Sequence, residues 1–141
     1  MSVEVNWLAV VLAAVSSMVV GSVWYLPSVF GKSWMQMTKS KMGKDANPAQ
    51  MAWMYGSVFV ASLVTAFVLA HVTFLAHNYF DNSLLQDALS TGFWLWLGLT
   101  AARFYVHDTF EGRRKKLTVI NAMHELVTVL VMATIIGLMK F

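Results

Sequence analysis

The sequence predicts an all-α integral membrane protein that folds as one bundle of four transmembrane helices. Hydrophobic residues make up 58% of the 141 residues and charged residues only 12%, whereas roughly a quarter of the residues of a soluble domain are charged. The apolar residues fall into four blocks, each long enough to cross a bilayer, with polar segments between them. No block remains for a water-soluble domain, so residues 1–141 are predicted to form a single transmembrane domain.

Aromatic residues mark both ends of the first predicted helix, residues 6–26. Trp7 lies at its start, and Trp24 and Tyr25 lie at its end. Such rings anchor a helix at the two membrane–water boundaries. No Lys or Arg precedes this block, so it lacks the basic region of a cleavable signal peptide and is expected to stay as a helix.

The polar segment that follows holds four lysines, and Phe30, Trp34 and Met37 recur in it at i, i+4 and i+7. This spacing predicts a short amphipathic helix at the membrane interface, anchored by Trp34, with its lysines toward anionic headgroups. A solvated loop is the alternative for this segment.

Helix-start signals place the next two helices at residues 48–76 and 84–107. Asn47 followed by proline is typical of an N-cap and the first helical residue. Ser83, with Gln86 three residues later, forms a capping box. The two signals therefore fix where the second and third helices begin.

The fourth helix is predicted over residues 117–139, and the turn before it determines the orientation of the chain. Gly112 suits the end of the third helix. A basic run then anchors the turn at the interface: Arg113, Arg114, Lys115 and Lys116. With Arg103, the first and third loops hold nine of the ten Lys and Arg, Lys140 being the exception. The positive-inside rule then places both loops in the cytoplasm and both termini outside, in a multi-pass protein of the inner membrane.

The net charge and the absence of cysteine exclude several kinds of partner and site. The net charge of +3 is explained by topology, so no nucleic-acid partner is predicted. The chain has no cysteine, which excludes disulfides, thiolate catalysis and Cys-based metal sites. An inverted two-plus-two repeat is also excluded, because the two predicted hairpins have the same orientation.

Several segments, in this order, resemble the uncharacterised bacterial membrane proteins grouped as domain of unknown function 1761. They are Asn6-Trp7-Leu8-Ala9, Gly21-Ser22-Val23-Trp24-Tyr25-Leu26-Pro27, Phe30-Gly31-Lys32-Ser33-Trp34-Met35, Gly92-Phe93-Trp94-Leu95-Trp96, Phe110-Glu111-Gly112-Arg113 and Ile120-Asn121-Ala122-Met123-His124. The resemblance covers nearly the whole chain and implies a small four-helix membrane protein. It implies no particular activity, substrate or cofactor.

The fourth predicted helix carries a polar cluster that comprises Asn121, His124, Glu125 and Thr128. From a cytoplasmic start near residue 117, Glu125 would lie about 12 Å deep at 1.5 Å per residue. Arg103 would lie about 9 Å deep on the preceding helix. That spacing would allow an ion pair between Arg103 and Glu125, and an unpaired charge at this depth is expensive.

Three interpretations of this cluster remain open. In the first, the side chains form a polar lock between helices that fixes their register. In the second, His124 and Glu125 border a water-filled cavity and exchange protons or bind a cation. A lipid-facing or oligomer-interface role is the third and weakest alternative.

No catalytic, cofactor-binding or metal-ligating residues are predicted, and an enzyme is the least supported class. His124-Glu125 fails the zinc-protease pattern because Thr128 stands where the second histidine is required. His71 and His77, six residues apart, do not share a helical face. The ten methionines suit apolar packing better than copper binding.

The sequence therefore predicts a structural, accessory or binding protein of the inner membrane. Its expected environment is the lipid bilayer, and its expected partners are further copies of itself or another membrane protein. The alternative is a small transporter or channel that uses Arg103, His124 and Glu125 to handle a proton or small solute. The identity of a small-molecule ligand is left open.

Overall fold

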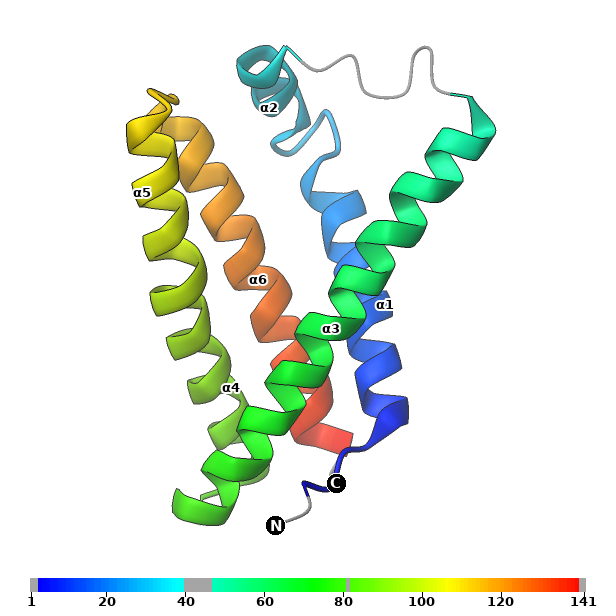
Figure 1. Cartoon of the computed structure of the whole chain (residues 1–141), viewed down its shortest axis with the longest axis vertical. Coiled ribbons are helices and arrows are strands. Elements are labelled where there is room, and N and C mark those ends of the chain that lie inside the picture. The colour runs from blue at the N-terminus through cyan, green and yellow to red at the C-terminus, as the bar shows by residue number, and fades with distance from the viewer. Residues whose placement is uncertain (1–2, 40–46, 81, 140–141) are drawn as a thin grey trace.

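The computed structural model describes residues 3–39, 47–80 and 82–139, which are helical apart from short turns (Figure 1). The elements in chain order are α1 (Trp7–Trp24), α2 (Gly31–Thr38), α3 (Pro48–Phe80), α4 (Leu84–Leu95), the π-helical segment η1 (Trp96–Ala101), α5 (Ala102–Phe110) and α6 (Lys115–Met139). The described residues contain no β-strand. The all-helical class predicted from the sequence is thereby confirmed.

The expected caps are present at the starts of α3 and α4. Oδ1 of Asn47 accepts a hydrogen bond from the backbone N–H of Ala49 at 2.7 Å. Oγ of Ser83 accepts one from the backbone N–H of Gln86 at 3.3 Å. Each cap satisfies a donor that the first turn of a helix leaves without an intrahelical partner.

The observed helix ends differ from the expected ones by a few residues. The first helix stops at Trp24 rather than at residue 26, because the chain turns before Pro27. The second continues to Phe80 rather than residue 76, and the fourth begins at Lys115 rather than residue 117. The amphipathic segment of the first loop is a helix, α2, and not an irregular loop.

The third predicted helix, residues 84–107, is not a single α-helix. The chain is helical from Leu84 to Phe110, but η1 divides this run into α-helices of 12 and 9 residues. A π-helical turn takes in about one residue more than an α-helical turn, so the faces of the following residues shift by about one position.

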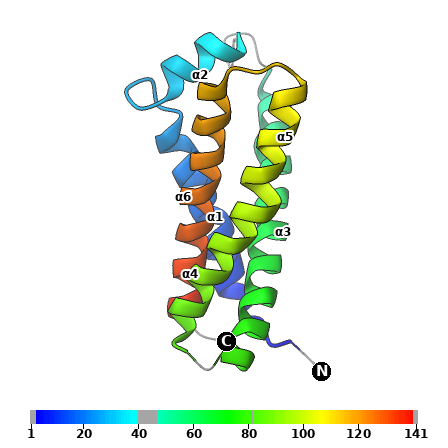
Figure 2. The same cartoon turned by 90° about the vertical axis from the view of Figure 1, so that its left-hand side faces the viewer.

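Four helical segments form a ring: α1, α3, the run from α4 through η1 to α5, and α6. Each segment packs mainly against two neighbours. The last helix, α6, packs mainly against α1 and α4, and α3 packs against the same two helices from the other side. Figures 1 and 2 show this ring from two directions, with both termini at the same end as the α3–α4 turn. The short α2 lies at the opposite end, beside the start of α6.

The core occupies the half of the ring nearest the termini. Its fully buried residues are mostly small or aliphatic: Val10, Ala13, Ala14, Ala66, Leu69, Ala70, Ala88, Val129, Met132, Ala133 and Ile136. The small side chains let the helices approach closely. Between α4 and α6 the approach depends on glycine, since a Cβ on Gly137 would lie 2.6 Å from Cα of Leu85.

The other half of the ring is open. The first eleven residues of α3, 48–58, are exposed except for the half-buried Met51. In Figure 1 this part of α3 leans away from α5 and α6. The helix has 33 residues and is therefore about 50 Å long, well beyond the ~30 Å of a bilayer core.

Three helices in the described part of the chain are long and apolar enough to cross a membrane. They are α1, α3 and α6, with mean hydropathies of 2.0, 2.3 and 1.9 over their most apolar windows. The helical run from Leu84 to Phe110 does not qualify as one helix, because η1 interrupts it. The fold thus supports a membrane protein with at least three apolar spans.

Candidate functional site

His124 and Glu125, the neighbouring ionisable residues of α6, bond to each other. Nδ1 of His124 lies 3.1 Å from Oε1 of Glu125, and the two side chains are 14% and 37% exposed. Because both partners belong to the same helix, this contact joins no two helices. The hydrogen bond of Glu125 to His124 therefore lies within α6.

The position of Glu125 on α6 follows from helical periodicity. Met132 and Ile136 lie seven and eleven residues further on, and thus on the same stripe. These two side chains are only 1% and 2% exposed and face the core. The stripe therefore faces the interior of the ring. Glu125 lies on the same stripe, seven residues before Met132, and its side chain is 37% exposed.

The imidazole of His124 faces α1. A Cβ added to Gly21 would lie 3.5 Å from Nε2 of His124, so the absence of a side chain at Gly21 makes room for the ring. The ring centroid lies 6.0 Å from that of Trp24 and 5.1 Å from that of Tyr25. The histidine is thus enclosed by aromatic groups from the end of α1.

Three buried polar atoms of this region have no hydrogen-bond partner within the described residues. They are Nε2 of His124, Nε1 of Trp24 and Oγ1 of Thr128, which lies one turn further along α6. Buried polar atoms in folded proteins are normally paired. The indole N–H of Trp24 can only donate, whereas Nε2 of His124 and Oγ1 of Thr128 can donate or accept, so all three can pair with a water molecule or a polar group of a ligand.

The turn between α1 and α2 brings further aromatic rings to the site. The ring of Phe30 lies 4.6 Å from that of Trp24, and the ring of Trp34 lies 5.3 Å from that of Tyr25. The turn depends on Gly31, where a Cβ would collide with the carbonyl oxygen of Tyr25. Residues 30–35, one of the segments that resemble the family, therefore fold back onto the end of α1.

Tyr25, which follows the last residue of α1, connects this aromatic cluster to α6. Its hydroxyl donates to Oδ1 of Asn121 over 3.4 Å, a long and weak hydrogen bond. Burial, and then the negative charge of Glu125, raise the pKa of the Tyr25 phenol to about 12. The phenol is therefore a protonated donor across the physiological pH range.

The expected ion pair between Arg103 and Glu125 is absent from the part of the chain that the structure describes. Arg103 is exposed, and the one ion-pair partner of Glu125 there is His124. The physical reason is the π-helical segment just before Arg103, which shifts its side chain to the outer face of α5. Of the five predicted cluster residues, four lie together on α6 and Arg103 does not join them.

Two polar clusters that the sequence interpretation missed lie at the two helical hairpins. At the α5–α6 turn, the hydroxyl of Thr118 donates to Oδ2 of the buried Asp108 at 2.6 Å, and Nε of Arg113 lies 3.7 Å from its Oδ1. At the α3–α4 turn, Nδ1 of His77 lies 2.9 Å from Oδ2 of the buried Asp87.

A simple sequence signal could have located both clusters. In each hairpin the bonded residues are ten positions apart, one on each helix, at equal distances from the middle of the turn. The middle residue also contacts the acid: Asn82 donates to Asp87 at 3.1 Å, as Arg113 faces Asp108. A polar pair placed symmetrically about a predicted helical turn therefore indicates a contact.

The residues predicted as interfacial anchors lie near the ends of the helices. Trp7 is 66% exposed and stacks on Phe67, with ring centroids 5.5 Å apart. Trp24, Tyr25 and Trp34 are half-buried in the aromatic cluster described above. The basic run of the α5–α6 turn, Arg113, Arg114, Lys115 and Lys116, is exposed.

The described residues contain no group of three or more His, Asp or Glu side chains that could hold a metal ion. The ionisable groups of the site are the Glu125 carboxylate and the His124 imidazole. The imidazole is a hydrogen-bond partner of the carboxylate. A carboxylate bonded to it and partly open to the interior of the ring can accept a proton or face a cation.

Fold and site together define an all-helical protein with three helices long and apolar enough to cross a membrane, and with a carboxylate–imidazole pair on its last helix. The chain belongs to a family described as a protein of unknown function (DUF1761), whose model matches residues 8–137. The family resemblance inferred from the sequence motifs is thereby confirmed. No curated protein and no solved structure matches the chain.

Proposed function

We propose that this chain is a four-span protein of the bacterial inner membrane, with the α1–α3 and α5–α6 turns in the cytoplasm and both termini outside. The distribution of Lys and Arg supports this orientation. The run from Leu84 to Phe110 would be the fourth span, because η1 keeps the backbone helical and its hydrogen bonds satisfied within the lipid.

In this membrane protein, the His124–Glu125 pair exchanges protons with the open half of the ring. The observation that carries the proposal is that Glu125 bonds only to its neighbour His124 within the described chain and is 37% exposed on the inner face of α6. Ionisable side chains inside a membrane are costly, and they commonly mark proton or ion pathways. A lock between helices would instead tie Glu125 to another helix.

A proton bound to the His124–Glu125 pair would be retained or released according to which ion or molecule lies in the open half of the ring. His124 supplies a second acceptor, since its Nε2 is buried without a partner among the described residues. The surrounding rings of Trp24 and Tyr25 exclude water and suit a cation, which aromatic faces attract. The function supported best is therefore proton-linked binding or transport of a small cationic solute.

The competing proposal is a structural or accessory role, in which this chain assembles with copies of itself or with another membrane protein. The indole of Trp96 supports it, because its Nε1 donates to the carbonyl oxygen of Ala122 at 2.8 Å and so joins η1 to α6. In that case Glu125 would contribute to stability and not to proton exchange.

Proton flux into proteoliposomes separates the two proposals. The purified chain is reconstituted into vesicles that contain a pH-sensitive dye, with potassium and valinomycin to compensate charge, and an external acid pulse is applied. We expect the wild-type protein to acidify the interior faster than empty vesicles. Glu125→Gln should abolish this excess rate, because it removes the titrating group and keeps the side-chain shape.

The matched control is Glu4→Gln, which neutralises an exposed carboxylate outside the helices and should retain the full rate. A thermal unfolding curve in detergent completes the comparison. If the wild-type protein conducts no faster than empty vesicles and Glu125→Gln lowers the midpoint temperature, proton exchange is wrong and the structural role stands.

A further inference from the structure

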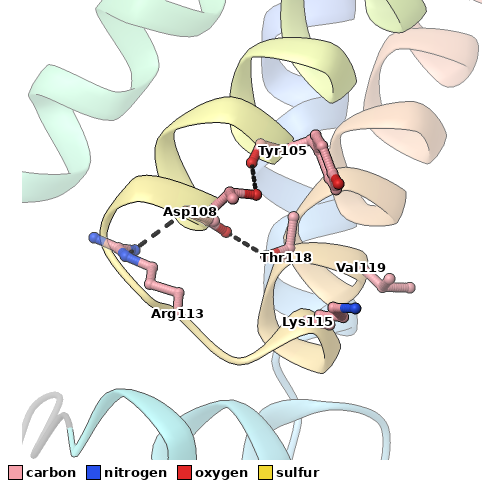
Figure 3. Close-up of a pocket in the computed structure, with 7 residues that line it drawn as sticks. Tyr105, Asp108, Arg113, Lys115, Thr118 and Val119 are labelled. Carbon is pink, nitrogen blue, oxygen red and sulfur yellow. Dashed lines mark hydrogen bonds and ion pairs between the residues drawn. The ribbon is translucent and has the colours of Figure 1, made fainter.

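A hollow of about 320 Å³ opens at the α5–α6 turn, at the end of the molecule where the basic residues gather. It lies between the last turn of α5 and the first turns of α6. Figure 3 shows Tyr105 and Asp108 on one helix, Lys115, Thr118 and Val119 on the other, and Arg113 in the turn between them. The hollow is separate from the His124–Glu125 site.

The acidic group of the hollow, Asp108, is hydrogen-bonded and shares Arg113 with Glu111. Asp108 is 9% exposed. Its Oδ2 accepts the Thr118 hydroxyl at 2.6 Å, and its Oδ1 lies 3.7 Å from Nε of Arg113. The backbone N–H of Arg113 also donates to the Asp108 carbonyl oxygen at 2.9 Å. These bonds hold Asp108 in place, and Arg113 offsets part of its negative charge.

The rim of the hollow is positively charged. Lys115 is exposed and forms no ion pair among the described residues. Arg114 and Lys116 flank it in the sequence. The only other acid of the turn, Glu111, is paired with Arg113. The N-terminus of α6 adds partial positive charge, because its first N–H groups have no intrahelical partner.

The sides of the hollow are apolar and face outward. Tyr105 is 65% exposed and Val119 is 59% exposed, and both lie deeper along the helices than the basic rim. In the proposed membrane orientation the rim lies at the cytoplasmic headgroup level, and these two side chains lie at the level of the acyl chains. An anionic end next to an apolar strip is the chemistry of a phospholipid.

We propose that this hollow binds one anionic phospholipid, with its phosphate at Lys115 and the start of α6 and an acyl chain along Tyr105 and Val119. Basic pockets on the cytoplasmic side of membrane helices attract such headgroups, and each Lys or Arg near the surface adds to the attraction. The inference rests on the membrane location in the proposed function. It does not depend on proton exchange at Glu125.

Native mass spectrometry of the full chain in detergent tests this site. The protein is titrated separately with phosphatidylglycerol, phosphatidylcholine and inorganic phosphate, and the affinity for the first bound molecule is compared. We expect phosphatidylglycerol to bind about fivefold or more tightly than phosphatidylcholine. Lys115→Gln should reduce the affinity for phosphatidylglycerol by about fivefold, which is roughly the effect of one cation near an anionic lipid surface.

Two matched variants make the result specific to the hollow. Lys32→Gln removes the same charge from the exposed face of α2 and should change the affinity by less than about twofold. Lys115→Arg keeps the charge and should retain wild-type affinity. Equal losses for Lys115→Gln and Lys32→Gln would overturn the site in favour of general surface attraction, as would equal binding of the two lipids. If inorganic phosphate displaces phosphatidylglycerol, the apolar strip contributes nothing and the lipid assignment is wrong.

Discussion

At Gly31 the chain passes so close to itself that a side chain does not fit. A Cβ there would collide with the carbonyl oxygen of Tyr25 and lie 2.9 Å from backbone atoms of Leu26. Both contacts are with backbone, which cannot move as a flexible side chain does. This tight turn also places Phe30 against Trp24. It thereby determines which aromatic rings surround His124.

We predict that Gly31→Ala costs about 1–3 kcal/mol of the free energy of unfolding, the usual penalty for forcing extra atoms into a packed site. Thermal unfolding in detergent, followed by helical circular dichroism, measures the loss. Gly56→Ala is the control, because a Cβ at Gly56 meets nothing within 4 Å. It should leave stability unchanged or raise it by up to about 1 kcal/mol, since alanine favours a helix. Equal stability of the two variants would contradict the tight turn.

Glu125 illustrates what a single residue reveals in a sequence and what it does not. A carboxylate next to an imidazole in an apolar run is visible in the sequence, and it identifies a site because such groups are expensive in lipid. Its partner is not visible there. The structure pairs it with the adjacent His124, because Arg103 lies beyond a π-helical segment that hydrophobic periodicity did not reveal.

At the scale of elements, the tightest packing joins α4 to α6. A Cβ on Gly137 would lie 2.6 Å from Cα of Leu85 and 3.2 Å from Cβ of Ala88, and one on Gly92 would lie 3.1 Å from Cγ1 of Val129. The two helices therefore touch through glycine at both positions. This contact closes the half of the ring that holds the core.

We expect Gly137→Ala to separate α4 from α6 and to cost about 1–3 kcal/mol of the free energy of unfolding. The matched control is Gly98→Ala in η1, where a Cβ meets nothing within 4 Å. Thermal unfolding of both variants in the same detergent gives the comparison. A Gly137→Ala protein as stable as the Gly98→Ala protein would show that the helices are not in close contact at this point.

At the scale of the whole molecule, the ring is closed at one end and open at the other. The closed half contains the buried core near the termini. The open half carries Glu125 on its inner face and the exposed start of α3. Under the proposed function, proton exchange at Glu125 would take place from the open half, which in the proposed orientation faces the cytoplasm.

We predict that reporter fusions at Lys39 and Arg114 give a cytoplasmic signal and that a fusion at Asn82 gives an external one. The reason is the positive-inside rule, since Lys and Arg concentrate in the first and third loops. Paired phosphatase and fluorescent-protein reporters at each position measure the location. A cytoplasmic signal at Asn82 would invert the orientation and place the opening of the ring outside the cell.

The sequence by itself determined the helical class, the apolar spans and the family, because helix periodicity, span length and local caps are encoded within a few neighbouring residues. It also determined that Asn121, His124, Glu125 and Thr128 share one helix. Only the tertiary structure decided which groups of helices distant in the sequence meet: Gly21 with His124, Tyr25 with Asn121, and Trp96 with Ala122. These contacts depend on how the rods cross and on where α4 gives way to η1, and such long-range packing leaves no periodic signal in the chain.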